Sequence, residues 1–304
     1  MVASSLATVG VTLVVGVYAV AVLERVTARC IAGDTIGWRD AATVPLRESA
    51  LLLVQRRTRT ERPDREAWAL APALLGALAA VAMLAVPLAP AGLDVEAGIV
   101  LFGAAAALVM VAVYLHGWAP NAVLPLLGGY RFVAQALSFE MPLALVLIAA
   151  ALPAESLSVG AIVRSQGELW NIVRQPLGLP LYLIAGLGLA FRGPLALPDA
   201  TDLAGGTEAD LSGAALLAWR VARAAVLVAV AAMGASVFLG GWLGPWLPGP
   251  IWVAGKTLVL LAVLVLAGHL TARVRLERFV VVAWTVLIPL ALVDVFVSGL
   301  LLLL

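Results

Sequence analysis

Polar side chains interrupt an apolar stretch of the chain between residues 117 and 145. Arg131, Gln135 and Ser138 are spaced i, i+4 and i+7, so a helix would place them on one face. Glu140 comes five residues after Gln135 and points toward a different neighbour, unless Pro142 kinks the helix and turns it back. Ionisable groups at membrane depth are costly and mark functional sites. We therefore expect Glu140 to be a protonatable relay group, the alternative being a neutral carboxyl that only fixes packing.

Four more charged residues lie inside apolar runs. Lys256, the only lysine, either exchanges protons in a desolvated site or extends its ammonium toward the outer membrane interface. Arg220 and Arg223 are three residues apart on one helix face, and they require an anionic partner. Asp294 is a lone acid, for which the sequence leaves open an ion-pair partner, a relay or a position at the membrane edge.

The chain offers few ligands for a redox centre of its own. Cys30 is the only cysteine, so an internal disulfide and a thiolate cluster are both excluded. We interpret His116 and His269, each near the end of an apolar run, as helix-end polar residues rather than as two haem ligands. The sequence contains no nucleotide-binding loop, metal-ligand cluster or nucleophile triad, and no basic surface for nucleic acid. Any redox centre must then lie in a partner.

The elements that position these residues are membrane helices. Hydrophobic residues make up 63% of the 304 residues, charged residues 12%, and the mean hydropathy is +1.07. A helix needs about 20 mostly apolar residues to cross roughly 30 Å of hydrocarbon, and about eight runs qualify. They cover residues 5–23, 68–89, 98–116, 134–152, 178–191, 213–235, 251–270 and 279–302, and the fifth is short. We predict an all-α integral membrane protein with short interfacial helices in its loops.

Arginines are distributed unevenly over the loops. Nine lie between residues 24 and 68, and others follow in the loops 117–133, 192–212 and 271–278. Only Arg164 and Arg174 fall in loops on the opposite side. The positive-inside rule therefore predicts that the arginine-rich loops are cytoplasmic and that both termini are outside.

We predict a single membrane domain over residues 1–304. Its long cytoplasmic loop, 24–67, contains the stretch "TVPLRESALLLVQ", whose apolar pattern fits a helix lying at the membrane interface. A second cytoplasmic loop, 192–212, is acidic. We find no internal repeat of the kind that marks many transporters.

Several motifs carry a resemblance to a known family. The stretch "GWAPNAVLPLLGGYRFVAQALSFEMPLAL" resembles the segment GW-x-x-N-x-x-x-x-LLGG-x-R-x-x-AQ-x-x-S-[YF]-E-x-P of the quinone-site membrane subunit of respiratory complex I, the H subunit of bacterial NADH:quinone oxidoreductase. Later signatures of that family are similar to "FRGPLALPDATDLAGGTEADLSG", "FLGGW", "PGPIWVAGK" and "RVRLERF", and earlier ones to "ERVTAR", "LRES" and "RPDREAWALAP". The resemblance covers essentially the whole chain. It implies eight spans with an external N-terminus in a bacterial-type cell membrane.

The resemblance also implies a function shared with partner subunits. Members of this family enclose one end of a chamber in which a quinone, such as ubiquinone, reaches the last iron–sulfur cluster of a peripheral arm. Their buried carboxylates begin a path that couples quinone reduction to proton translocation. We therefore expect quinone as a substrate, iron–sulfur clusters only in partner subunits, and contacts with lipid, other membrane subunits and a cluster-bearing arm.

The motif match carries two groups of site residues over to this chain. The candidate proton-relay residues are Glu140, Lys256, Asp199, Asp202 and Asp210. The candidate residues of the quinone chamber and its loops are Arg131, Glu24, Arg25, Glu48, Arg192, Arg273 and Arg275.

The chain departs from the family pattern at several positions that are usually charged. Thr201 replaces an acid of the acidic loop, Leu189 replaces a glutamate, and Leu51 replaces a lysine. Arg223 stands where the family usually has a glutamate. Either coupling follows an altered path, or it is weak and the chain serves mainly as an anchor and a wall of the quinone chamber.

Two other interpretations stay open. One is the equivalent subunit of a membrane-bound nickel–iron hydrogenase or a ferredoxin-linked complex, because the acidic loop is weak. The other is a free-standing transporter, which the lack of internal repeats argues against.

Overall fold

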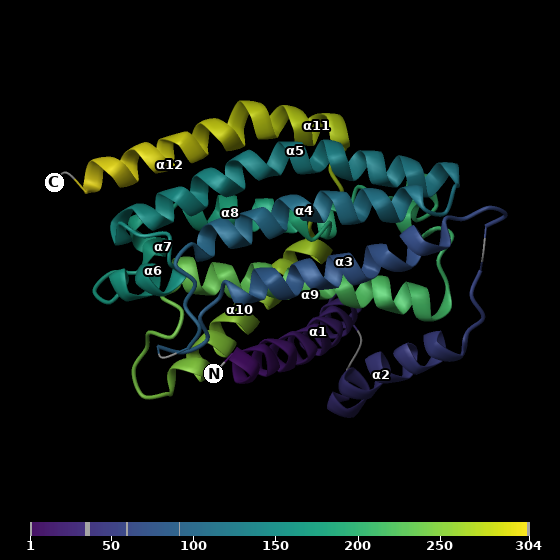
Figure 1. Ribbon diagram of the computed structural model, residues 1–304, viewed down its shortest axis with the longest axis horizontal. Helices are drawn as coiled ribbons and strands as arrows, with labels where there is room; N and C mark the ends of the chain where they lie inside the picture. Colours follow the sequence, from purple (N-terminus) through teal and green to yellow (C-terminus); the bar gives the residue numbers. More distant parts are fainter. Residues whose placement is uncertain (1, 34–36, 59, 91, 303–304) are drawn as a thin grey trace.

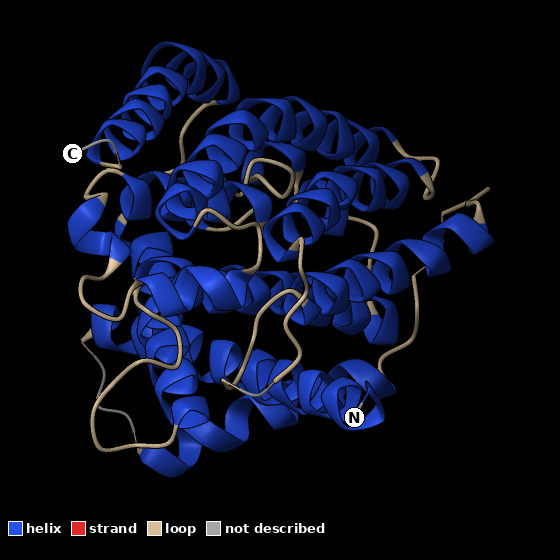
Figure 2. Ribbon diagram, turned by 60° about the vertical axis from the view of Figure 1, so that its left-hand side comes forward, coloured by secondary structure: helices blue, strands red, loops and turns tan. Residues whose placement is uncertain are grey.

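The computed structural model describes residues 2–33, 37–58, 60–90 and 92–302, and all regular structure in these ranges is helical (Figure 2). Seven helical stretches are long and apolar enough to cross a membrane. They are α1 (Val2–Ala32), α3 (Arg65–Leu84), α4 (Gly98–Trp118), α5 (Val123–Ala151), α9 (Gly213–Phe238), α10 (Gly249–Leu270) and the joined stretch from α11 (Leu276–Val282) through the π-helical turn η5 (Ala283–Leu287) to α12 (Ile288–Leu301). The prediction of an all-α membrane protein is confirmed.

The expected fifth span is helix α8 (Gly178–Leu189). Its 12 residues extend only about 18 Å at 1.5 Å per residue, well short of the roughly 30 Å of hydrocarbon that a full span crosses. The segment before it consists of short pieces, η1 (Leu152–Ala154), α6 (Val159–Ser165) and α7 (Asn171–Arg174), which we call the capping segment. Gly178 and Leu179 in the first turn of α8 are buried.

The expected boundary of the fourth span is wrong. We predicted a loop over 117–133, but α5 begins at Val123 and therefore contains Arg131. The helix extends this far because Gly128 and Gly129 let its first turns pack closely: Gly129 lies against Gly117 of α4, and Gly128 against Thr207 of the acidic loop. Packing thus overrides the weak helix propensity of the glycine pair.

The connecting segments gather at two opposite ends of the bundle. Both termini are at one end, whereas α2 (Trp38–Val54) is at the other (Figure 1). Hydrogen bonds join the loops at the α2 end, for example from the Thr58 backbone N–H to the Ser212 hydroxyl and from Asp64 N–H to the Ala119 carbonyl. Three 3-10 turns, η2 (Gly193–Leu195), η3 (Thr201–Leu203) and η4 (Gly206–Glu208), fold the acidic loop against the same end. We call this the arginine-rich end.

Helix α9 forms the centre of the bundle: in its most apolar stretch of 18 residues, 94% of the residues are buried. It packs against α1, α2, α3, α8 and α10 (Figure 1). Its many alanines permit close approach of these neighbours, because a small side chain lets helix axes come together. Arg220 and Arg223 therefore project from the most central helix of the protein.

Candidate functional site

A cavity of about 670 Å³ opens between α1, α2 and α9 at the arginine-rich end. Its walls are mostly apolar, with Val14 and Val17 from α1 and Leu46 and Leu52 from α2. Its charged lining residues are Glu24, Arg25, Glu48, Arg192, Glu208, Arg220 and Arg223. The cavity thus combines an apolar passage with a charged inner wall.

Arg223 is the centre of a buried ion cluster on that wall. One of its guanidinium nitrogens, Nη1, lies 2.7 Å from Asp199 Oδ2 and 2.7 Å from Glu208 Oε1. The other, Nη2, donates to the Phe191 carbonyl at 3.0 Å, and the guanidinium lies 4.3 Å from the centre of the Phe191 ring. The side chains of all three charged residues are 16% exposed or less. The buried charge of Arg223 is therefore neutralised by two carboxylates.

Arg220 completes this cluster from one turn earlier on α9. Its Nε and Nη2 both donate to Glu208 Oε2, at 3.1 and 2.8 Å. The prediction that Arg220 and Arg223 require an anionic partner is confirmed. Sequence reasoning did not single out Glu208 as that partner, although its place just before α9 was the available signal.

Arg192 and Glu24 form a second ion pair beside the first cluster. Both side chains also line a smaller cavity of about 200 Å³, which reaches His269 on α10 and Arg223 on α9. The His269 ring nitrogen Nδ1 lies 2.9 Å from the Val265 carbonyl. The two cavities share Glu24, Arg192, Arg223 and His269 as lining residues, so the same charged wall borders both.

The surroundings change the proton affinities of the loop residues in this cluster. Burial raises the pKa of Asp199, and the charge of Arg223 opposes that rise. Burial also acts on Glu208, but the nearby Arg223 and Arg220 outweigh it and lower the pKa of this carboxyl. Burial, reinforced by the charge of Arg223, lowers the pKa of Arg192 to about 9. Two carboxylates that share one arginine therefore differ in how readily they take up a proton.

Arg131 lies outside the cavities and binds Asp202 of the acidic loop. Two hydrogen bonds, of 3.0 and 2.6 Å, join the guanidinium to the two carboxylate oxygens. These bonds lower the pKa of Asp202, and Arg273 adds a smaller effect. Arg273 and Arg275 are exposed, and Asp210 lines neither cavity. The pair fastens the acidic loop to the first turns of α5.

Arg25 and Glu48 connect α1 with α2 at the rim of the large cavity. Their side chains form an ion pair of 3.2 Å and are both more than one third exposed. Helix α2 occupies the middle of the 24–67 loop, and its Leu51 and Val54 are largely exposed. The pair holds this helix over the opening.

Glu140 lies on a different face of α5 from Gln135 and Ser138. Gln135 is fully buried and donates to the Gly188 carbonyl of α8 at 2.8 Å, whereas Glu140 is half-buried. The Glu140 Oε1 atom is buried without a hydrogen-bond partner among the described residues. Glu140 lines neither charged cavity. It is nine residues beyond Arg131, about 13 Å farther along the helix.

Lys256 lies near the opposite end of the bundle. Its ammonium donates to the carbonyls of Gly241 and Leu243 at 2.9 and 2.6 Å and lies 4.4 Å from the centre of the Trp170 ring. The side chain does extend toward that end, but it is only 7% exposed. Its contacts fix the turn between α9 and α10.

His116 has an environment that the sequence did not reveal. It is fully buried, and its ring stacks on Trp219 of α9 with 3.6 Å between ring centres. Both ring nitrogens lack a hydrogen-bond partner among the described residues. The expectation of a helix-end position is correct, but the side chain faces the core beside the ion cluster rather than the surface.

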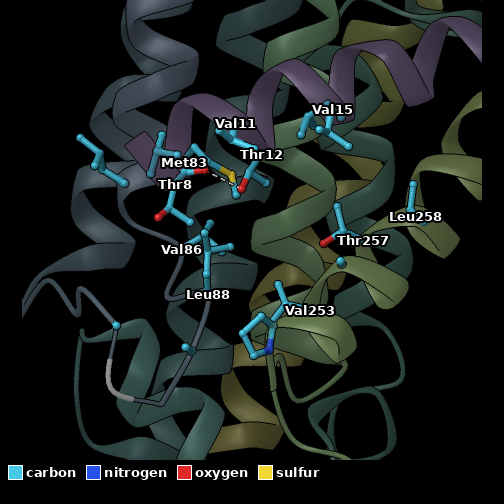
Figure 3. Close-up of a pocket in the computed structure, with 18 of the residues that line it drawn as sticks. Thr8, Val11, Thr12, Val15, Met83, Val86, Leu88, Val253, Thr257 and Leu258 are labelled. Carbon is cyan, nitrogen blue, oxygen red and sulfur yellow. Dashed lines mark hydrogen bonds between the residues drawn. The ribbon is translucent and has the colours of Figure 1, made fainter. Parts of the chain in front are cut away.

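An apolar cavity of about 430 Å³ lies at the end of the bundle that contains the termini, between α1, the end of α3 and the start of α10 (Figure 3). Val11, Val15, Val86 and Val253 are among its lining residues, and no charged side chain is found among those that the structure describes there. Thr257 contributes a buried hydroxyl without a hydrogen-bond partner among the described residues. This cavity differs in character from the charged one.

Comparison with known proteins gives one consistent family. The sequence model of the family described as NADH dehydrogenase matches residues 4–299. The chain is 36% identical over 239 residues to the NADH-quinone oxidoreductase H subunit 1 of Rhodopseudomonas palustris strain BisA53, covering 78% of this chain and 75% of that one. It is 32% identical over 278 residues to the NADH-quinone oxidoreductase H subunit of Anoxybacillus flavithermus, covering 89% and 83%. The chain therefore belongs to the NADH dehydrogenase family, among the membrane-embedded H subunits of the NADH-quinone oxidoreductases.

Proposed function

We propose that the large cavity admits a quinone and that this chain forms the membrane side of the quinone chamber in a complex I-type oxidoreductase. The observation that carries the proposal is the cavity's division into apolar walls and a charged inner wall. The walls of α1 and α2 suit an isoprenoid tail, and the volume lies within the range of about 300–1,000 Å³ that is usual for small-molecule sites. Electrons reach the quinone from iron–sulfur clusters in partner subunits.

Reduction of a quinone to a quinol consumes two electrons and two protons. Two members of the ion cluster, Glu208 and Arg223, line the cavity, and Asp199 lies behind them in contact with Arg223. The raised pKa of Asp199 and the lowered pKa of Glu208 set an order in which Asp199 takes up a proton first. Protonation of Asp199 frees part of Arg223, which then binds Glu208 alone. In this way a change of charge at the cavity alters the ion pairs of Arg223, which lies on the central helix α9.

Glu140 is the proposed next group on the path toward neighbouring membrane subunits. Its half-buried carboxyl lies on α5 away from the α8 contact, so a second subunit can cover it. Proton translocation would then pass from the cluster through this chain to its membrane partners. Lys256 remains a relay candidate because it lies inside the apolar helix α10. Its ammonium, however, donates its hydrogen bonds to carbonyls in the turn between α9 and α10, which is a structural role.

Substitutions that remove titration test this path. In the assembled complex, Glu208→Gln and Glu140→Gln should each lower quinone-coupled proton movement about tenfold, equivalent to about 1.4 kcal/mol on the barrier. Glu155→Gln is the matched control, because Glu155 is an exposed carboxyl that lines neither cavity and is not a relay candidate. Parent rates and parent pH dependence in both glutamine variants, at normal assembly, would show that these carboxyls are structural.

The arginine-rich end is the proposed docking face for the cluster-bearing peripheral arm. The loops 24–67 and 192–212 lie at this end and carry charges of both signs, and the exposed Arg273 and Arg275 are beside them. Arg62→Glu combined with Arg65→Glu should release the arm during purification and leave the membrane subunits together. If the arm co-purifies unchanged, the docking face lies elsewhere.

A further inference from the structure

Buried polar side chains form a layer at the end of the bundle opposite the arginine-rich end. They come from the α6–α7 segment, the end of α9 and the second half of α12. The members of this layer are Gln166, Asn171, Gln175, Ser236, Asp294 and Ser298, each less than a tenth exposed. Asp294 is the only acid among them, and the proposed quinone path does not include it.

The amides of this layer connect the capping segment to the helix ends. Gln166 donates to the Ser236 carbonyl at 3.0 Å and accepts from the Gly240 N–H at 3.0 Å. Asn171 donates to the Val237 carbonyl at 2.9 Å, and Gln175 donates to the Ala149 carbonyl. The amide nitrogens of all three are thus occupied and their side chains are fixed.

Several oxygen atoms of the layer nevertheless lack protein partners. Among the described residues, the buried atoms without a hydrogen bond include Asn171 Oδ1, Gln175 Oε1, Ser236 Oγ, Asp294 Oδ2 and Ser298 Oγ. Buried polar atoms in native proteins are nearly always bonded to protein or to ordered water. A buried water typically bonds to about three such groups. The layer therefore has the polar partners that buried water requires.

The Asp294 carboxylate faces the first residue of α8. A Cβ atom added to Gly178 would lie 3.2 Å from Asp294 Oδ2 and 3.4 Å from the Cβ of Gln175. Among the described residues, no side chain caps the N-terminus of this 12-residue helix. The Gly178 N–H is already used, because it donates to the Gln175 carbonyl at 3.0 Å, and Pro180 has no N–H. Asp294 thus faces the positive end of the α8 dipole without a described hydrogen bond to its Oδ2 atom.

Lys256 is the buried cation at this end, but it belongs to α10 and donates to the Gly241 and Leu243 carbonyls. In the described parts of the elements that pack against α12, no cation is paired with Asp294. Helix α12 packs against α5, α8, η1 and η5. In α5, Arg131 and Glu140 are 18 and nine residues before Ala149, about 27 and 13 Å away along the helix, and Tyr130 is more distant still. The Tyr182 hydroxyl of α8 donates to the Val230 carbonyl. Arg174 of α7 forms none of the described ion pairs.

We propose that Asp294 is a proton-exchange site served by buried water, through which a proton passes between the carboxyl group and the aqueous phase at this end of the bundle. The step is the transfer of one proton from the carboxylic acid to a water molecule, giving a carboxylate and a hydronium ion. Ser298, one turn later on the same face, supplies a hydroxyl to the same water. The site lies at the end opposite the quinone cavity, and its function does not require quinone turnover.

Dicyclohexylcarbodiimide tests this assignment, because it reacts with protonated carboxyl groups in apolar surroundings. Native membranes containing the assembled protein are treated over a range of pH, and the adduct on the peptide that contains Asp294 is measured by mass spectrometry. We expect an adduct whose yield falls as the pH rises. The exposed Glu155 at the same end should react only with a water-soluble carbodiimide.

Two variants probe the surroundings of the carboxyl without removing it. Ser298→Ala takes away a group that stabilises the carboxylate through water, so the midpoint of labelling should move to higher pH by about half a unit, a threefold change in proton affinity. Gly178→Ala fills the space beside Oδ2 and should slow labelling. Absence of an adduct at every pH, or a yield that does not vary with pH, would overturn the proposal.

Discussion

The two ends of the helix bundle contain buried polar groups of different kinds. At the arginine-rich end, Arg223 is paired with Asp199 and Glu208, and Arg192 with Glu24. At the opposite end, the acid Asp294 and the cation Lys256 are both buried but are not paired with each other, and several amide and hydroxyl oxygen atoms have no partner among the described residues. Buried ion pairs respond to a change in charge by exchanging partners, whereas an acid outside any described ion pair responds by gaining or losing its proton. The comparison teaches that burial alone does not define the role of a membrane carboxylate; the charge of its neighbours does.

The contrast between the two ends of the bundle requires that they face opposite sides of the membrane. The distribution of arginines predicts that the arginine-rich end is cytoplasmic and that both termini are outside. In a Cys30→Ala background, cysteines introduced at Arg57 and at Ser156 should therefore react with a membrane-impermeant thiol reagent from opposite sides. Labelling of both cysteines from one side would disprove this topology.

Removal of the central arginine should have the largest effect on stability. Arg223→Ala leaves the buried Asp199 carboxylate without its cation, whereas Glu208 keeps Arg220, and breaking a buried pair costs about 3–5 kcal/mol. Arg220→Ala is the matched control, because its side chain is 54% exposed and an exposed pair contributes about 0–1 kcal/mol. Thermal unfolding in detergent measures both. Equal losses in the two variants would mean that the cluster is hydrated and not a buried network.

The Arg131–Asp202 pair should have the smallest effect, and one that depends on pH. The pKa of Asp202 is lowered in the folded protein, so its stabilisation is present above the unfolded pKa of about 4 and is lost as the pH falls through the lower folded value. Because Asp202 is 60% exposed, Asp202→Asn should lower the Tm by no more than about 3 °C at neutral pH. At acid pH the two proteins should unfold alike. A difference that persists in acid would assign the effect to packing of the loop.

Much of the fold could be predicted from the sequence because membrane spans depend on local composition. The runs of apolar residues placed the helices, and the arginines indicated which loops gather at one end. The predicted start of α5 was too late because Arg131 was assigned to a loop before the apolar run that begins at residue 134, although contacts with α4 and the acidic loop keep the preceding residues helical.

The site was harder to predict because its contacts join distant segments. The spacing of Arg220 and Arg223 indicated that an acid was missing, but not that Glu208 and Asp199 would share Arg223. Nothing in the sequence indicated that the His116 ring would stack on Trp219, since the two residues are about a hundred positions apart. A local pattern reveals which groups need a partner, and only the fold reveals the partner.

The π-helical turn η5 determines which face of the last helix, α12, points into the protein. Four buried residues, Phe279 of α11, Ala283 and Leu287 of η5 and Ala291 of α12, follow one another at steps of four. Three such steps exceed three turns of an α-helix by about 1.2 residues, and a π turn accommodates about one extra residue. Deletion of one residue within Ala283–Leu287 would restore a regular α-helix and rotate everything beyond it by about 100°. Asp294 and Ser298 would then leave the protein interior, so the inward direction of this acid is encoded by a single inserted residue some ten positions earlier in the chain.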